Sequence, residues 1–166
     1  MKRILTFIRE HRFARNETGG ALAELAIMVP FLVVMLATVT ELGRLFQTYT
    51  DLSKATRVAA RNISNVAYTS QNINSTKNVA VCGKIDCTGL TPVVPNLTTD
   101  NVTVTPEYAA CDCGNPIRVT VSIVNYNFLP IFNLGALIGN DRLMALPASG
   151  STTMYYMWVD PAGAAP

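Results

Sequence analysis

The fold is decided by the start of one apolar run, Thr18-Gly19-Gly20-Ala21-Leu22-Ala23-Glu24. Residues 21–39 carry Glu24 as their single charge and are long enough to cross the hydrocarbon core of a bilayer. A charged side chain inside such a segment costs about 2.5–3.5 kcal/mol on insertion scales, so it indicates a function. If the chain is cut after Gly19, Gly20 becomes a free amino terminus. The Glu24 carboxylate can then pair with the new ammonium of a neighbouring copy.

The charges of the chain are unevenly distributed, and this predicts the direction of insertion. Residues 1–19 contain five basic and two acidic side chains, so they carry a net charge of +3, while the rest of the chain carries −1. Because positive residues stay in the cytoplasm, we expect the amino terminus there and everything after about residue 45 outside. The alternative is a secretory signal peptide. Its small-residue cleavage site follows the apolar region, whereas here the small residues precede it.

Helical periodicity continues beyond the predicted span. Apolar residues fall on one face at three- and four-residue steps: Leu42, Leu45, Phe46, Tyr49, Leu52, Ala55 and Ala59. We therefore expect one helix from about residue 21 to about residue 65, with its inner half in the membrane and its outer half packed on a small domain. Pro30 lies inside this helix and predicts a kink, which bilayers and packed neighbours tolerate.

The rest of the chain predicts a small β-rich domain. Residues 69–95 are rich in Asn, Thr, Ser and Pro and indicate a loop. Strands are expected at 101–105, 117–123 and 151–158, where residues alternate or are rich in Thr, Tyr and Met. The fold class is therefore α+β, a long amino-terminal helix packed on a small antiparallel sheet. The predicted organisation is a leader (1–19), a span (20–40), a helix continuation (41–65), an outer domain (66–160) and a disordered tail (161–166).

Four cysteines, Cys82, Cys87, Cys111 and Cys113, fall in the predicted outer domain, where disulfides persist. A bridge between Cys111 and Cys113 would strain a very short loop. We therefore expect each of these two to join one of Cys82 and Cys87, and two connectivities satisfy this. The alternative is a zinc site with four cysteine ligands. The cysteine spacing departs from the usual ribbon pattern of two residues within each pair, so disulfides are favoured.

Several function classes have no signal in the sequence. His11 is the only histidine and lies in the leader, so the outer domain has none for a nucleophilic triad or a histidine metal site. No glycine-rich phosphate loop follows a predicted strand, and the acidic residues are too scattered for a glycosidase pair. The net charge of −1 outside the leader offers no basic surface for nucleic acid. We expect no enzyme, no cofactor, no metal and no nucleic-acid partner.

Four segments carry a resemblance to a known family. They are Gly19-Gly20-Ala21-Leu22-Ala23-Glu24-Leu25-Ala26, then Pro30, then Glu41-Leu42-Gly43-Arg44, and then Ala55-Thr56-Arg57-Val58-Ala59-Ala60-Arg61. With these segments the chain resembles the TadE-like minor pilins, or pseudopilins, of tight-adherence (Tad, type IVc) pilus systems. Leu25 departs from the family, which usually has Phe or Tyr there. Beyond residue 100 the resemblance is general in character.

The resemblance implies a route from membrane to pilus. A membrane prepilin peptidase would cleave after Gly19, at the end of a class III signal peptide. Glu24 would then guide docking to the major pilin and other minor pilins at the inner-membrane assembly platform. Before assembly the chain would span the inner membrane once, in contact with lipid, with its outer domain in the periplasm; after assembly it would be extracellular. Major Tad pilins are much shorter, so the added domain implies a minor subunit for initiation or the tip, supporting adhesion.

Two other functions stay open at this point. The chain can be a signal-anchored binding domain that is never cleaved and never polymerises, in which case residues 1–19 are retained. It can also be a secreted enzyme or adhesin rich in disulfides, which predicts cleavage after the apolar run and a soluble product. The mass of the mature protein distinguishes the three.

Overall fold

The structure, a computed structural model, describes residues 17–110, 115–132, 139 and 147–159. The elements in chain order are helix α1 (Glu17–Ser64), helix α2 (Ser70–Cys82), the 3-10 turn η1 (Thr99–Asn101) and strands β1 (Val102–Glu107), β2 (Arg118–Asn127) and β3 (Pro147–Tyr155). The chain divides into two compact units, residues 1–40 and 41–166. Most of the predicted leader and the whole predicted tail lie outside the described residues.

In the first unit, α1 has the properties of a membrane anchor. The described residues contain one helix long and apolar enough to cross a membrane, and it lies near the amino terminus. Its large apolar side chains between Leu22 and Val39 are 39% to 76% exposed, so no protein core covers them. The helix continues through Pro30 without ending there. The predicted long helix is therefore confirmed, while the kink at Pro30 stays a prediction.

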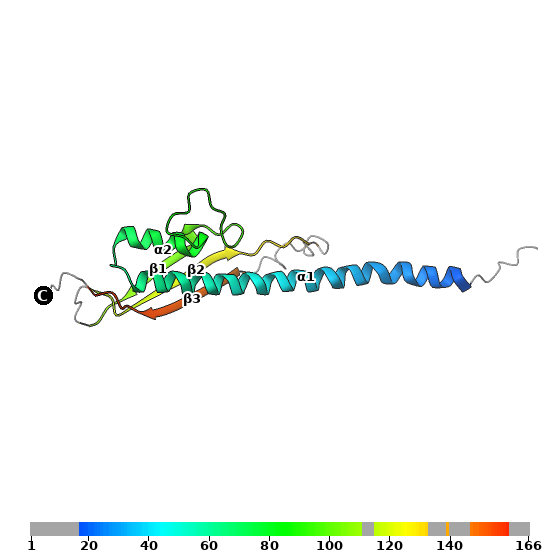
Figure 1. Cartoon of the computed structure of the whole chain (residues 1–166). Coiled ribbons are helices and arrows are strands. Elements are labelled where there is room, and N and C mark those ends of the chain that lie inside the picture. The colour runs from blue at the N-terminus through cyan, green and yellow to red at the C-terminus, as the bar shows by residue number, and fades with distance from the viewer. Residues whose placement is uncertain (1–16, 111–114, 133–138, 140–146, 160–166) are drawn as a thin grey trace, which may run out of the picture. The chain divides into compact units, whose positions relative to one another are not determined.

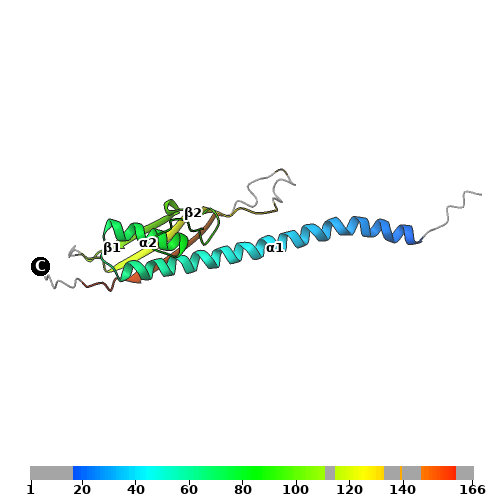
Figure 2. The same cartoon turned by 45° about the horizontal axis from the view of Figure 1, so that its top comes forward.

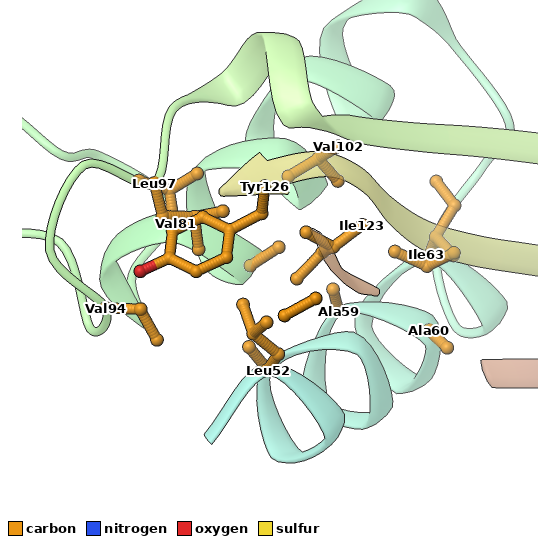
Figure 3. Packing of buried hydrophobic residues seen from close by; sticks show 14 of the residues in the cluster. Leu52, Ala59, Ala60, Ile63, Val81, Val94, Leu97, Val102, Ile123 and Tyr126 are labelled. Carbon is orange, nitrogen blue, oxygen red and sulfur yellow. The ribbon is translucent and has the colours of Figure 1, made fainter. Parts of the chain in front are cut away.

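The second unit contains a three-stranded antiparallel sheet in the order β1-β2-β3. Figures 1 and 2 show this sheet and α2 beside the carboxy-terminal half of α1. Alternation along β2 buries Val119, Val121 and Ile123 on one face of the sheet. These side chains join a single core with residues of both helices, and Figure 3 shows Leu52 of α1 and Val81 of α2 in that cluster. The predicted α+β fold is confirmed.

Strand β3 lies close to α1 because one of its residues has no side chain. A Cβ atom on Gly150 would meet the backbone oxygen of Leu52 at 3.3 Å. The hydroxyl groups of Thr56 and Thr152 lie 3.0 Å apart and form a hydrogen bond across the same contact. After the strand, the Met157 amide donates to the Ser64 carbonyl at the end of α1, over 2.9 Å.

The prediction of a loop over residues 69–95 is wrong in its first half, where the chain forms α2. The side chain of Thr69 caps the helix by accepting a hydrogen bond from the Asn72 amide. Gly83 ends it in the left-handed conformation, with φ of 75°. Between them Val79 and Val81 enter the core. Burial of this face stabilises a helix that its polar composition disfavours.

Strand β2 runs four residues further than the predicted end at residue 123. It passes through a bulge between Ile123 and Tyr126, in which Asn125 adopts a φ of 57°. The side-chain amide of Asn101 donates to the carbonyls of Val124 and Asn125, at 3.3 and 3.1 Å, and holds this bulge in place. After the bulge Tyr126 returns to the buried face, and the chain leaves the sheet at Phe128.

Candidate functional site

The residues predicted for processing and assembly lie at the start of α1. Gly19, Gly20 and Glu24 are all exposed. A Cβ atom on Gly20 would have no neighbour within 4 Å, so this backbone is open to approach. Glu24 takes part in no ion pair among the described residues. The roles of these three residues in processing and assembly stay predictions.

The cysteines are paired differently from the prediction. A disulfide joins Cys82 to Cys87, whose Cα atoms are 5.8 Å apart. The expected bridges from these two residues to Cys111 and Cys113 are therefore wrong; the latter two lie outside the described residues. A cysteine in a disulfide is not a thiolate ligand, so the four-cysteine zinc site is not formed either. Among the described residues no three acidic, histidine or cysteine side chains gather as a metal site.

Local turns explain why Cys82 pairs with so near a neighbour. Gly83 reverses the chain directly after α2, and the side-chain amide of Asn78 then donates to the Ile85 carbonyl over 2.9 Å. The Asp86 carboxylate accepts from both the amide and the hydroxyl of Thr88, which lowers the pKa of Asp86. These bonds fold the segment back along the helix and bring the two sulfur atoms together.

Among the described residues of the second unit, Glu41 is a buried charged side chain. Its side chain is only 3% exposed, although it lies one residue after the end of the first unit. One turn further along α1, the Arg44 guanidinium reaches both carboxylate oxygens, at 3.2 and 3.0 Å. A buried carboxylate requires partners of this kind, because an unpaired charge is costly to remove from water.

The second set of partners of Glu41 comes from the chain beyond β2. Its Oε1 atom accepts hydrogen bonds from the backbone amides of Ile131 and Phe132, at 2.7 and 2.9 Å. The Arg44 guanidinium also lies over the ring of Phe128, 5.4 Å from its centroid. We call this arrangement the Glu41 site: Glu41, Arg44, Phe128 and the backbone of Ile131 and Phe132. It ties residues 128–132 to α1.

The hydrogen bonds of the Glu41 site fix the position of the chain segments that it joins. Four hydrogen bonds hold the carboxylate, three of them at Oε1 and one at Oε2, and fix its position. Nearby, Tyr126 donates its hydroxyl to the Pro95 carbonyl over 3.0 Å. Burial raises the pKa of Tyr126, and the charge of Arg44 acts in the opposite direction. Sequence analysis identified the segment from Glu41 to Arg44, but it did not predict that this segment contacts Phe128 and the backbone of Ile131 and Phe132.

A second surface runs along the outside of α1. Leu42, Phe46 and Tyr49 are 52%, 63% and 55% exposed and recur at steps of four and three residues, which places them on one face of the helix. We call these three residues the Phe46 stripe. Beside them an open groove of about 400 Å³ is bordered by Leu45 and by residues 147–149 of β3. The stripe extends the exposed apolar surface of α1 beyond the predicted span.

The outer face of the sheet is polar. The hydroxyl groups of Thr120 and Thr153 form a hydrogen bond of 2.7 Å across β2 and β3. At the end of the same strands, Arg118 donates to the Tyr155 hydroxyl at 2.9 Å and pairs with Glu107 at 3.6 Å, and these contacts raise the pKa of Arg118. These described side chains therefore pair with one another across the strands.

Comparison with known proteins gives one match, on α1. The family model described as TadE-like protein matches residues 19–61. The matched segment contains Gly19, Glu24 and Pro30, together with Glu41 and Arg44 of the Glu41 site. No curated protein matches the chain, and neither does any solved structure. Over residues 19–61 the chain is similar to TadE-like proteins, which relates it to Tad pili and confirms the resemblance expected from its sequence.

Proposed function

We propose that this chain is a minor pilin of a Tad pilus, cleaved between Gly19 and Gly20 and assembled through α1. The observation that carries the proposal is the position of the family match, which begins at the proposed cleavage site and ends within the helix that packs on the outer domain. The proposed role is structural: initiation of the pilus or formation of its tip, with adhesion as the outcome. The proposed partners are a prepilin peptidase, other pilins and the inner-membrane assembly platform.

The start of α1 is suited to cleavage. Gly19 and Gly20 lie in the first turn of the helix, where the first amide groups have no intrahelical acceptor. Each glycine costs a helix about 1 kcal/mol relative to alanine, so two adjacent glycines allow this turn to open easily. A peptidase at the cytoplasmic surface would then meet the exposed Gly20, at which an added Cβ would have no neighbour within 4 Å.

Glu24 is suited to recognition between subunits inside the membrane. It is the only charge in an exposed apolar segment, and lipid cannot satisfy a carboxylate. After cleavage, the new ammonium of a neighbouring Gly20 provides a partner of opposite charge. Since leaving one member of a sheltered ion pair alone is costly, the pair would fix the register of the subunits more than their affinity.

The Phe46 stripe supports assembly through the outer half of α1. Three large apolar side chains stay exposed on one helix face after the helix has left the predicted span. Exposed apolar stripes with this spacing are typical of surfaces that pack on another helix. We infer that the helices of neighbouring pilins cover this stripe in the fibre.

The experiment that tests the proposal combines mature mass with assembly in the native host. We expect the membrane-extracted chain to begin at Gly20. We expect Glu24→Ala to be inserted and cleaved normally but to be lost from sheared pili. Glu17→Ala is the matched control, because it removes a carboxylate from the leader that cleavage discards, and pili should be unaffected.

Other outcomes would support the other candidates. A terminus at Met1 would leave a signal-anchored domain that is not processed, and a terminus beyond Thr40 would indicate a secreted protein. If pili contain Glu24→Ala at the wild-type level, the ion-pair role of Glu24 is wrong even if cleavage occurs as proposed.

A further inference from the structure

The segment that follows β2 exposes three large apolar side chains in a short space. Leu129, Ile131 and Phe132 are 61%, 70% and 49% exposed. No charged residue occurs between Phe128 and Phe132. We call Leu129, Ile131 and Phe132 the apolar tip. An exposed apolar group of this kind on an ordered part of a domain indicates a partner.

The Glu41 site fixes where the apolar tip lies along α1. The amides of Ile131 and Phe132 are 2.7 and 2.9 Å from the Glu41 carboxylate, so their side chains lie beside this residue. Glu41 directly follows the predicted span (20–40), and one residue of helix rises only about 1.5 Å. Where residues 20–40 cross the bilayer, the apolar tip is held beside the point at which α1 leaves the hydrocarbon core.

We propose that the apolar tip inserts into the interfacial region of the outer leaflet and gives the outer domain a second contact with the membrane. This inference rests on the single-pass anchoring included in the proposed function. The lipid surface is the occupant that the position favours, because it is present beside residue 41 whenever α1 spans the bilayer. Arg44 fits the same interface, since its side chain is 35% exposed and combines an apolar stem with a charged end.

The contact would restrain the outer domain at the membrane before assembly. A single helix does not by itself prevent rotation of the domain about the helix axis, whereas a second insertion point does. Glu41 preorganises the tip, because it binds the backbone amides and leaves the apolar side chains of Ile131 and Phe132 facing outward. When the subunit moves from the membrane into the pilus, the apolar tip would lose its contact with lipid and contact the surface of another subunit instead.

Quenching of tryptophan emission by brominated lipid tests the proposal on the full chain. Trp158 is the only tryptophan, so Trp158→Phe gives a silent background. In this background we would reconstitute Phe132→Trp and Ile131→Trp in phosphatidylcholine vesicles with plain or brominated acyl chains. Leu36→Trp, within the span, is the positive control.

Met157→Trp is the matched negative control. Met157 is also apolar and 64% exposed, but its amide is bonded to Ser64, 23 residues along α1 from Glu41, which is about 35 Å of helix. We expect bromine to lower the emission of Phe132→Trp and Ile131→Trp by a fraction close to that of Leu36→Trp. The emission of Met157→Trp should stay unchanged.

Each other result contradicts a defined statement. If Leu36→Trp is quenched but neither tip variant is, the apolar tip does not contact lipid and the proposal is wrong. Equal quenching of Met157→Trp would mean that the whole domain lies on the bilayer, which also overturns a specific contact at the tip. An unquenched Leu36→Trp would instead reject the membrane span, and with it the proposed function.

Discussion

Glu41 is a carboxylate that folding removes from water, and its burial is offset by four hydrogen bonds of 2.7 to 3.2 Å. Two of them come from a guanidinium on the same helix and two from backbone amides 90 and 91 residues away. Hydrogen bonds to a charged group are among the stronger ones in proteins. The residue thus connects the start of the second unit on α1 to the chain beyond β2.

We expect Glu41→Ala to lower the free energy of unfolding by about 2 kcal/mol, because two amides lose their acceptor and Arg44 loses its partner. Glu41→Gln keeps one oxygen that can accept from both amides, but it removes the charge and places an NH2 donor opposite the Arg44 guanidinium. It should lose less than Glu41→Ala, about 1 kcal/mol. Urea unfolding of the detergent-solubilised chain measures both variants. Equal losses would show that charge matters and that the bonds from Ile131 and Phe132 do not.

Two glutamates of α1 differ in how well sequence could identify them. Glu24 is recognisable because it interrupts an apolar run, and that signal lies within a few residues of it. Glu41 follows the run among ordinary helix residues. Its partners are backbone amides, which every residue other than proline possesses, so no pattern of side chains marks them. The burial of Glu41 could therefore not be predicted from the sequence alone.

Helix α2 illustrates the same limit for an element. Its sequence is rich in Asn, Ser and Thr, which compete with the helix through their own hydrogen bonds, so propensity predicted a loop. The capping residue Thr69 and the terminating Gly83 were visible in the sequence. The helix forms because Ala80 and Val81 are buried in one core cluster with residues of α1 and β1, and this burial depends on long-range packing.

Long elements with a strong pattern were predictable. The periodicity of α1 gave its end within one residue, since the helix ends at Ser64. The alternation of Val119, Val121 and Ile123 identified the centre of β2. The extension of β2 through its bulge was not predictable, because Asn101 holds the bulge from another part of the chain.

The contact between β3 and α1 gives a prediction at two glycines. Gly150→Ala should destabilise the domain by about 1–3 kcal/mol, because its Cβ would meet helix backbone, which cannot rotate away. Gly43→Ala is the control on α1 itself. It has no neighbour within 4 Å and should stabilise the helix by up to about 1 kcal/mol. Urea unfolding gives both values, and losses of the same sign would contradict the close approach at Gly150.

Across the whole molecule, helix α1 serves three environments, which are lipid, the core of the domain and an exposed surface. The first part of α1 exposes apolar side chains on every side, as a lipid-facing segment does. The second part buries Leu52, Ala59 and Ile63 in the domain core while the Phe46 stripe stays exposed on another face. Apolar residues of α1 therefore divide into those that stabilise the fold and those that are available for assembly.

This division predicts that two apolar residues of α1, six positions apart, respond differently to the same truncation. Leu52 is fully buried, so Leu52→Ala should lower the free energy of unfolding by about 2–5 kcal/mol and reduce the amount of protein in the cell. Phe46 is 63% exposed, so Phe46→Ala should change the free energy of unfolding by less than about 0.5 kcal/mol. The same variant should reduce the share of the chain found in sheared pili. Val58→Ala is the control, because Val58 is 54% exposed on α1 but lies outside the Phe46 stripe, and neither quantity should change. If Phe46→Ala reaches pili at the wild-type level, the stripe is not an assembly surface, whatever the result at Leu52.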